Sequence, residues 1–362
     1  MRLKDVDQLE LPPAADMHVH LRQGQVMELV VPSIRRGGVD TVFVMPNLQP
    51  PITSVVAALE YKSRLQAIEP DVNYLMSLYL HPSVTPEVIA EAATAGIAGV
   101  KLYPQGVTTN SESGVAGDFV EAYAPTFAAM EEYGVVLNLH GEVPGTVPNG
   151  EVSLEELFLP ILKRLNEKFP KLRIILEHCS TAAAVDAVRA CSSTVAGTIT
   201  AHHLYLTGDI SEVDPHAFCK PIPKQPSDRD ALLKAACSGD PKFFLGSDSA
   251  PHPLINKQGK PVPAGVFTQP YATQLVLLAL EDATERGIID EKDVTQEHIE
   301  GFLSLFGRRF YQLPEPSPSG PRIVLKKTGE TIPQGITSAD GTLEIGISRA
   351  GATVFSLQFA SR

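Results

Sequence analysis

The sequence predicts an α/β protein folded as a (β/α)8 TIM barrel, and three observations support this fold class. Short segments rich in Val, Ile and Leu alternate with segments of helical periodicity along most of the chain. Most of these short segments are apolar throughout, as in parallel strands that are buried on both faces. The first of them ends in a His-x-His pattern, whereas an open, doubly wound sheet normally continues there into a Gly-rich phosphate loop. We therefore expect a closed barrel surrounded by helices.

The expected elements follow one another as strand, helix, strand, helix. Eight strands are predicted, at residues 16–21, 41–46, 72–80, 99–103, 135–140, 173–178, 194–200 and 243–247. The clearest amphipathic helices are predicted at residues 54–68, 85–95, 153–169 and 269–286. Gly37-Gly38 and Gly96 are typical helix C-caps, and Pro70 is a typical helix stop.

The last part of the chain departs from this pattern. Pro314, Pro316 and Pro318 end the last helical segment, and a strand-rich sequence follows them. We expect residues 1–312 to form the barrel and residues 313–362 to form a small C-terminal extension packed on it.

Composition excludes several classes of protein. The 362 residues are 43% hydrophobic, which is enough for a large core, and they carry a formal net charge of -12. Nucleic acid and anionic membrane are unfavourable partners for such a chain, because phosphate binding needs clustered Lys and Arg. An anionic small molecule is still compatible, since metal ions and a few arginines can make one pocket positive.

Cysteine content and the start of the chain bear on location. The four cysteines form no C-x-x-C pair and no disulfide framework, which is typical of a reducing compartment. We find neither a signal-peptide pattern nor an apolar run of membrane-spanning length. These features predict a soluble, cytoplasmic protein that acts on a small-molecule substrate.

Metal-ligand residues recur where the expected strands end, and barrels of this kind place their functional residues at that end. His18 and His20 share one face, because alternate residues of a strand do. An isolated His-x-His is usually structural, but burying many polar groups without a shared partner would cost several kcal/mol. A pair of divalent metal ions is the simplest shared partner. The candidate ligands are His18, His20, His140, His178 and Asp248.

Other histidines are assigned to ordinary structural roles. They include His81, His216 and His298, which occur singly. His202 and His203 follow the seventh strand and could be a further ligand pair. We assign them to structure, because adjacent residues of a strand face opposite ways and the ligand positions are already filled.

Lys101 also lies on one of these strands, where an ammonium group would repel metal ions. With this residue the pattern resembles the amidohydrolase superfamily, and within it the dihydroorotase family of the short, monofunctional type, over residues 16–310. The resemblance implies that CO2 carboxylates Lys101 to a carbamate, which bridges two Zn2+ ions together with a hydroxide. One ion would be held by His18, His20, Asp248 and the carbamate, and the other by His140, His178 and the carbamate.

The same resemblance implies a set of substrate-binding residues. Arg22, Asn47 and His252 correspond to groups that hold the substrate carboxylate, for which a planar guanidinium is well suited. Arg22 alone would be read as a surface ion pair. Thr108 and Thr109 correspond to a loop, residues 106–111, that closes over the substrate.

Backbone groups complete the implied pocket. Ala264 and Lys220 lie where the family offers backbone groups to the ring amide of the substrate. Relatives can have an apolar residue at the Lys220 position, so only a backbone role is carried over to it.

The implied activity is the reversible cyclisation of N-carbamoyl-L-aspartate to dihydroorotate in pyrimidine (UMP) biosynthesis, by a homodimer. The hydroxide would attack the ring carbonyl, and Asp248 would pass a proton to the departing ring nitrogen. Two alternatives stay open. A hydantoinase or allantoinase would share the metal ligands and differ in the carboxylate-binding residues. A non-catalytic scaffold would be expected to have lost ligands, whereas here all six positions are filled.

Overall fold

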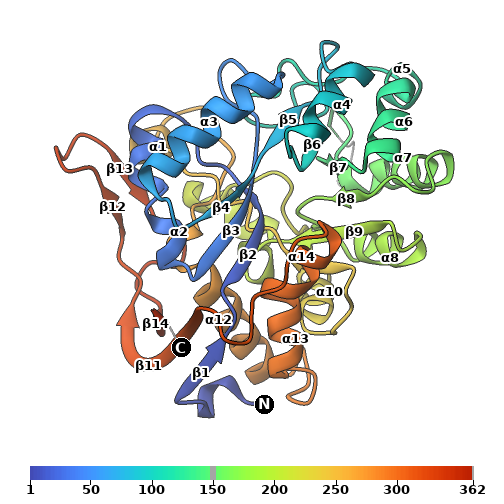
Figure 1. The fold of residues 1–362 in the computed structure, drawn as a ribbon. Helices are drawn as coiled ribbons and strands as arrows, with labels where there is room; N and C mark the ends of the chain where they lie inside the picture. Colours follow the sequence, from blue (N-terminus) through green and yellow to red (C-terminus); the bar gives the residue numbers. More distant parts are fainter. Residues whose placement is uncertain (147–151, 361–362) are drawn as a thin grey trace.

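The computed structural model describes residues 1–146 and 152–360 and confirms the predicted barrel (Figure 1). Two groups of parallel strands follow one another around it, in the orders β2-β3-β4 and β5-β6-β7-β8-β9-β10. The strands are β2 (Ala14–Val19), β3 (Val39–Val44), β4 (Asn73–Leu75), β5 (Ser77–Tyr79), β6 (Gly99–Leu102), β7 (Val136–Leu139), β8 (Ile174–Leu176), β9 (Val195–Ile199) and β10 (Phe243–Leu245). Because only Met76 separates β4 from β5, these two form the single third strand that the sequence predicts.

The barrel closes between its first and last strands. A parallel bridge joins Val19 at the end of β2 to Ser249 after β10. The amide of His20 donates to the Ser249 carbonyl at 3.0 Å, and the amide of Asp248 donates to the His18 carbonyl at 2.9 Å. Closure therefore brings residues that are far apart in sequence to the same point of the rim.

Helices lie outside the strands (Figure 1). They are α1 (Gly24–Val30), α2 (Ser33–Arg36), α3 (Val55–Ile68), α4 (Pro86–Thr94), α5 (Phe119–Ala122), α6 (Ala124–Tyr133), α7 (Leu154–Lys168), α8 (Ala182–Ala190), α9 (Gly208–Val213), α10 (Pro226–Ala236), α11 (Leu254–Lys257), α12 (Ala272–Glu285), α13 (Gln296–Glu300) and α14 (Phe306–Phe310). Short 3-10 turns are η1 (Leu3–Asp5), η3 (His202–Leu204), η4 (Pro215–Ala217) and η5 (Gln269–Tyr271), and η6 (Gly301–Leu305) is a π-helical turn.

Side-chain caps explain where several helices begin. The hydroxyl of Ser54 accepts from the Ala57 amide at the start of α3, and Thr181 does the same for Ala184 at the start of α8. Ser153 forms a capping box with Glu156 at the start of α7. The helices predicted at residues 54–68, 85–95 and 153–169 are confirmed to within one residue at each end, and the fourth is divided into η5 and α12.

The barrel interior is a packed apolar core and not a channel. Its cluster includes Ala15, Met17, Phe43, Met45, Leu75, Val136, Ile175, Ala196, Phe244 and Tyr311. Tyr311, which follows α14, packs against the Phe43 ring in a tilted arrangement with centroids 5.1 Å apart. This core closes the end of the barrel opposite to the candidate site, which is confined to the other rim.

Both ends of the chain build the small sheet beside the barrel (Figure 1). β1 (Gln8–Leu11) pairs antiparallel with β11 (Arg322–Thr331), which pairs with β14 (Thr353–Ala360). A hairpin of β12 (Gly335–Thr337) and β13 (Glu344–Gly346) extends from this sheet. The division at residue 312 stays a prediction, and the strand from the N-terminal region was not expected. Among the described residues, no helix is long and apolar enough to span a membrane.

Candidate metal centre and substrate pocket

The first three predicted ligands meet where the barrel closes. Nε2 of His20 lies 3.0 Å from Oδ1 of Asp248, and Nε2 of His18 lies 3.2 Å from the same oxygen. All three side chains are buried, and their ligand atoms lie within 4.8 Å of one another. Burial alone would raise the pKa of Asp248, but the charge of His18 and the hydrogen bonds with His18 and His20 hold it well below its usual value. The carboxylate is therefore ionised and suited to a cation.

The second pair of histidines lies beside the first. His140 directly follows β7, and His178 is the second residue after β8. Their ring centroids are 4.7 Å apart. The His178 ring also lies 5.2 Å from that of His18. Burial lowers the pKa of His140 and lowers that of His178 well below its usual value. Both imidazoles are neutral at pH 7, as a metal ligand must be.

Each of three histidines has a polar partner on one ring nitrogen. Nδ1 of His18 lies 2.8 Å from Glu177, and Nδ1 of His20 lies 2.9 Å from Oδ1 of Asn47. Nε2 of His140 lies 2.8 Å from Glu142. Such contacts fix the tautomer of a ligating histidine and leave its other nitrogen free for a metal ion.

The sequence reasoning did not identify two of these partners. Glu177 directly precedes His178, and Glu142 follows His140 by two residues, so their positions beside ligands were the available signal. Glu177 accepts hydrogen bonds of 2.6 Å from Asn138 and from Thr198, and it is fully buried. Such a fixed carboxylate holds the His18 ring in one orientation.

Lys101 lies on β6 with its side chain wholly buried. Within residues 1–146 and 152–360, no hydrogen-bond acceptor reaches its Nζ atom, which lies 5.2 Å from the centre of the Tyr103 ring. Burial lowers the pKa of Lys101 to about 8, so part of the amine is neutral near physiological pH. An unpartnered, partly neutral amine beside the neutral imidazoles of His140 and His178 fits a lysine that becomes a carbamate ligand, because that change supplies a negative charge.

Arg22 and His252 lie next to the predicted metal ligands. Nε of Arg22 donates to the Pro251 carbonyl at 3.1 Å, and its Nη2 lies 3.2 Å from Nε2 of His252. His252 in turn contacts the Ala264 carbonyl at 2.9 Å. Burial and the charge of Arg22 lower the pKa of His252 to about 3, so that this ring is neutral. Arg22 therefore provides the positive charge at this side of the pocket.

The loop at residues 106–111 lies over the same pocket. Asn47 donates to the Thr109 carbonyl at 3.0 Å, and the Thr109 hydroxyl donates to the Ala264 carbonyl at 3.3 Å. Nζ of Lys220 donates to the Val107 carbonyl at 3.4 Å. With this loop in place the free space inside is only about 20 Å³.

The structure brings the predicted site residues together around this pocket. Those that line it are His18, His20, Arg22, Asn47, Thr108, Thr109, His140, His178, Lys220, Asp248 and Ala264. Lys101 lies beside them, since its Nζ atom is 5.2 Å from the centre of the ring of Tyr103, which also lines the pocket. The individual roles of these residues in binding and catalysis stay predictions.

The histidines assigned to structure divide into two groups. His81, His216 and His298 do not line the pocket, and His298 contacts the Cys237 carbonyl at 2.8 Å. The expectation that the side chains of His202 and His203 face opposite ways, as on a strand, was wrong. These two residues lie in the 3-10 turn η3 and not on a strand, so that both rings approach Cys219.

Comparison with known proteins identifies the family. The sequence profile of the family described as Amidohydrolase matches residues 76–207. The chain is 51% identical over 330 residues to the probable dihydroorotase of Schizosaccharomyces pombe, covering 91% of this chain and 94% of that protein. It is also similar to the crystal structure of dihydroorotase in complex with 5-fluoroorotic acid from Saccharomyces cerevisiae. That match has a TM-score of 0.89 and 42% identity, and it covers 99% of this chain and 100% of that chain.

A more distant structure shows how far the fold extends. The L-hydantoinase (dihydropyrimidinase) of Arthrobacter aurescens matches with a TM-score of 0.74 at 17% identity, over 98% of this chain and 86% of that chain. This likeness concerns the fold alone. Since the chain is 51% identical to the probable dihydroorotase of Schizosaccharomyces pombe over 91% of its own length, it belongs to the dihydroorotase family, hydrolases that act on a cyclic amide in pyrimidine biosynthesis.

Proposed function

We propose that this chain catalyses the reversible cyclisation of N-carbamoyl-L-aspartate to dihydroorotate. The observation that supports this substrate most directly is the position of Arg22, which lies at the same rim as the convergent histidines and Asp248. A guanidinium at the rim beside a metal centre can hold the carboxylate of a substrate while the amide bond is formed or broken. His252 contacts Arg22, and Asn47 contacts the loop at Thr109. These two side chains complete a polar surface for the same carboxylate.

We also propose that the site holds two Zn2+ ions bridged by a carbamate on Lys101. His18, His20 and Asp248 would hold one ion and His140 and His178 the other, with the carbamate shared. The orphaned Lys101 amine and the unpartnered Nδ1 of His178 support this arrangement, because each is a buried polar atom without another use in the described chain. Zinc supplies a hydroxide at neutral pH and polarises the reacting carbonyl.

The residues of the chain provide binding and proton transfer. Asp248 is ionised and buried, so it can accept a proton and return it to the ring nitrogen when the amide bond breaks. Glu177 and Asn47 keep the His18 and His20 rings in place during the reaction. Ala264 and Lys220 line the pocket, and their backbone groups would bond the polar groups of the ring.

A substrate comparison tests this proposal. The zinc-reconstituted chain should open dihydroorotate with a kcat/KM at least about 100-fold above that for hydantoin or allantoin, because neither offers the carboxylate that Arg22 binds. Asp248→Ala should bind zinc more weakly and lose nearly all turnover, and Asp186→Ala on the outer helix α8 is the matched control. Equal rates on hydantoin, or an active Asp248→Ala variant, would refute the proposal.

We further propose a cytoplasmic location and a homodimer. The four cysteines are all free, which is compatible with a reducing compartment. The dimer rests on the family resemblance, and light scattering coupled to size-exclusion chromatography distinguishes it from a monomer.

A further inference from the structure

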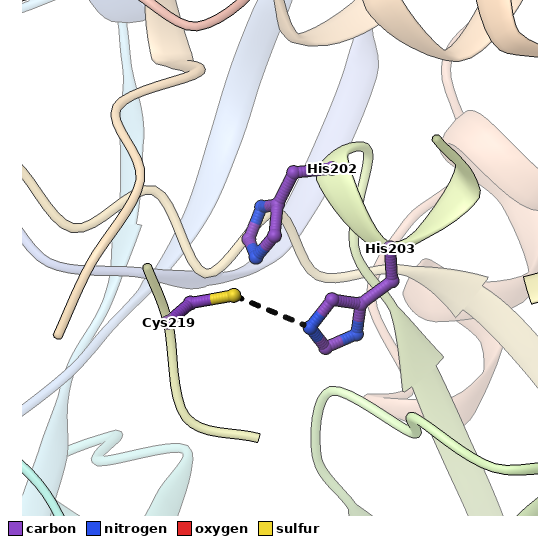
Figure 2. A group of neighbouring side chains, drawn as sticks. All are labelled: His202, His203 and Cys219. Carbon is purple, nitrogen blue, oxygen red and sulfur yellow. Dashed lines mark hydrogen bonds between the residues drawn. The ribbon is translucent and has the colours of Figure 1, made fainter. Parts of the chain in front are cut away.

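A second cluster of metal-ligand side chains lies beside the substrate pocket. His202 and His203 come from η3, and Cys219 comes from the segment after η4 (Figure 2). All three are buried, with exposed fractions of 0%, 0% and 2%. One ligand atom of each lies within 4.8 Å of the others, and Sγ of Cys219 is 3.9 Å from Nε2 of His203. None of the three belongs to the proposed zinc centre.

His203 is held between two carbonyl oxygens. Its Nδ1 atom lies 3.1 Å from the Cys179 oxygen, and its Nε2 atom lies 3.0 Å from the Pro221 oxygen. A neutral imidazole has one N–H group, so it can donate to only one of these two oxygens. Burial lowers the pKa of His203, which disfavours the doubly protonated ring that could donate to both. One ring nitrogen therefore directs a lone pair at a place where a cation would be stabilised.

His202 has no such contacts. Neither of its ring nitrogens has a hydrogen-bond partner in the part of the chain that the structure describes. Figure 2 shows the ring directed towards the space between the Cys219 sulfur and the His203 ring. A buried polar group without a partner costs about 1–3 kcal/mol, so a ring left this way in a well-packed wall indicates a ligand.

We propose that His202, His203 and Cys219 hold a further divalent metal ion of the zinc class, separate from the centre at Lys101. Two imidazoles and one thiolate are a donor set that Zn2+ prefers. Bonds of about 2.3 Å to sulfur and 2.0 Å to nitrogen place the two ligand atoms about 3.5 Å apart in a tetrahedral site. The observed separation of 3.9 Å needs only a small inward movement.

Two neighbouring groups fit this site. With a metal ion at Nε2 of His203, its Nδ1–H can donate to the Cys179 carbonyl, the outer contact that ligating histidines commonly make. The Pro221 oxygen, 3.0 Å from Nε2, is placed to serve as a fourth ligand. With the metal ion bound, the single N–H group of His203 no longer has to serve two carbonyl oxygens.

Binding has a defined proton balance. Burial raises the pKa of the Cys219 thiol, so the metal-free group is a neutral thiol. When the metal–sulfur bond forms, the S–H bond breaks and the proton passes to solvent. The apparent affinity therefore rises with pH.

The location suggests what the ion does. The site joins the η3 turn to Cys219, and the next residue, Lys220, lines the substrate pocket and donates to the Val107 carbonyl of the loop. Cys219 itself lines that pocket, so a metal ion here would stiffen the wall that supports the closed loop.

Cobalt substitution tests the proposal directly. The metal-free protein titrated with Co2+ should develop a near-ultraviolet thiolate-to-cobalt absorption band, because Cys219 would be a sulfur ligand and the centre at Lys101 has only nitrogen and oxygen ligands. Cys219→Ser should abolish the band and lower the bound zinc from about three to about two ions per chain. Cys191→Ser, at the end of α8, is the matched control and should retain both.

If Cys219→Ser fails to fold, a variant that retains the Cys219 thiol still tests the proposal. His202→Asn should retain the band but weaken cobalt binding at that site at least about tenfold. The proposal is refuted by a wild-type protein without the band while cobalt fills the other centre, or by a band that survives in Cys219→Ser. The band is read without substrate, so this result and the substrate comparison above can fail independently.

Discussion

Burial favours the neutral form of three histidines and of Lys101 at the candidate centre. His20, His140 and His178 are all kept neutral by it, with the pKa of His20 lowered to about 4. The same effect lowers the pKa of Lys101, and the neutral amine that it favours is a nucleophile. A single physical cause thus favours both the neutral form of the proposed ligands and the reactive form of the amine that we propose to be carboxylated.

The pKa of Lys101 leads to a pH prediction. Only the neutral amine attacks CO2, and the neutral fraction rises as the pH passes through about 8. At a fixed concentration of dissolved CO2, the recovery of activity by metal-stripped protein in zinc should therefore become faster with rising pH through that value. Stopped assays after timed incubation measure the rate, and Lys101→Ala should not recover at any pH. A recovery rate that is unchanged across that range would contradict the assignment.

The shape of the Arg22 side chain gives a second residue-scale prediction. Arg22→Lys keeps the charge but loses the planar fork that reaches both Pro251 and a carboxylate. We expect kcat/KM for carbamoyl-aspartate to fall about 100-fold, mainly through KM, with the zinc content unchanged. Steady-state kinetics and metal analysis measure both quantities. Arg64→Lys on the outer face of α3 is the control, and an unchanged KM in Arg22→Lys would exclude the proposed contact.

At the scale of elements, the loop at residues 106–111 must move for the substrate to enter, since the space beneath it is about 20 Å³. The Thr109 hydroxyl is one of the groups that hold it closed, at 3.3 Å from the Ala264 carbonyl. Thr109→Val should raise KM by about 2- to 10-fold, the value of one hydrogen bond. Thr94→Val removes a similar hydroxyl-to-carbonyl bond on α4 and should leave KM unchanged. Equal effects of the two substitutions would contradict a role for the closed loop.

A buried carboxyl couples helix α7 to the segment after β8. Glu155 accepts from the Ser180 amide at 2.9 Å and from the Thr181 hydroxyl at 2.6 Å, and burial raises its pKa from 4.5 to about 8. Between these two values the folded state binds the proton that the unfolded state releases, so the free energy of unfolding falls as pH rises.

Glu155→Gln removes this titration. Its thermal midpoint, measured by circular dichroism, should decline less steeply than that of the wild-type protein as pH rises from about 4.5 to about 8. Glu156→Gln would disturb the capping box, so exposed Glu167→Gln on α7 is the better control. Parallel pH profiles for Glu155→Gln and the wild-type protein would show that the carboxyl is ionised in the fold.

At the scale of the whole molecule, the strand from the N-terminal region and the tail depend on each other. Leu9 and Leu11 of β1 pair with Leu325 and Ile323 of β11, and all four side chains are buried. A chain ending at Leu313 would uncover the first two, so we expect its thermal midpoint to fall by roughly 10 °C or more, or the protein to aggregate. Lys326→Ala, at an exposed position of β11, is the control. If the truncated chain were as stable as the full chain, the stability of the barrel would not depend on the C-terminal strands, contrary to this expectation.

The strands, and the place where the candidate metal ligands converge, could be predicted because each has a local signal. Parallel strands are continuous apolar runs, and the ligands come where those runs end, as His140 does after β7. The pairing of β1 with β11 joins residues more than 300 positions apart and leaves no local trace. The η3 turn begins after β9 has ended at Ile199, so the alternation that the argument on His202 used no longer applied.

Carboxylates that orient ligands are hard to recognise for a related reason. Glu177 and Glu142 resemble many other acidic residues in sequence, and only the fold directs them at a histidine ring. Their identification therefore required the three-dimensional structure.

A crystal structure of the zinc-reconstituted protein, with diffraction recorded on both sides of the zinc absorption edge, tests the central claim most directly. We predict two anomalous peaks among the histidines and Asp248, with continuous density extending Lys101 into a carbamate between them. A single peak there, or an unmodified Lys101 amine, would contradict the proposed binuclear centre.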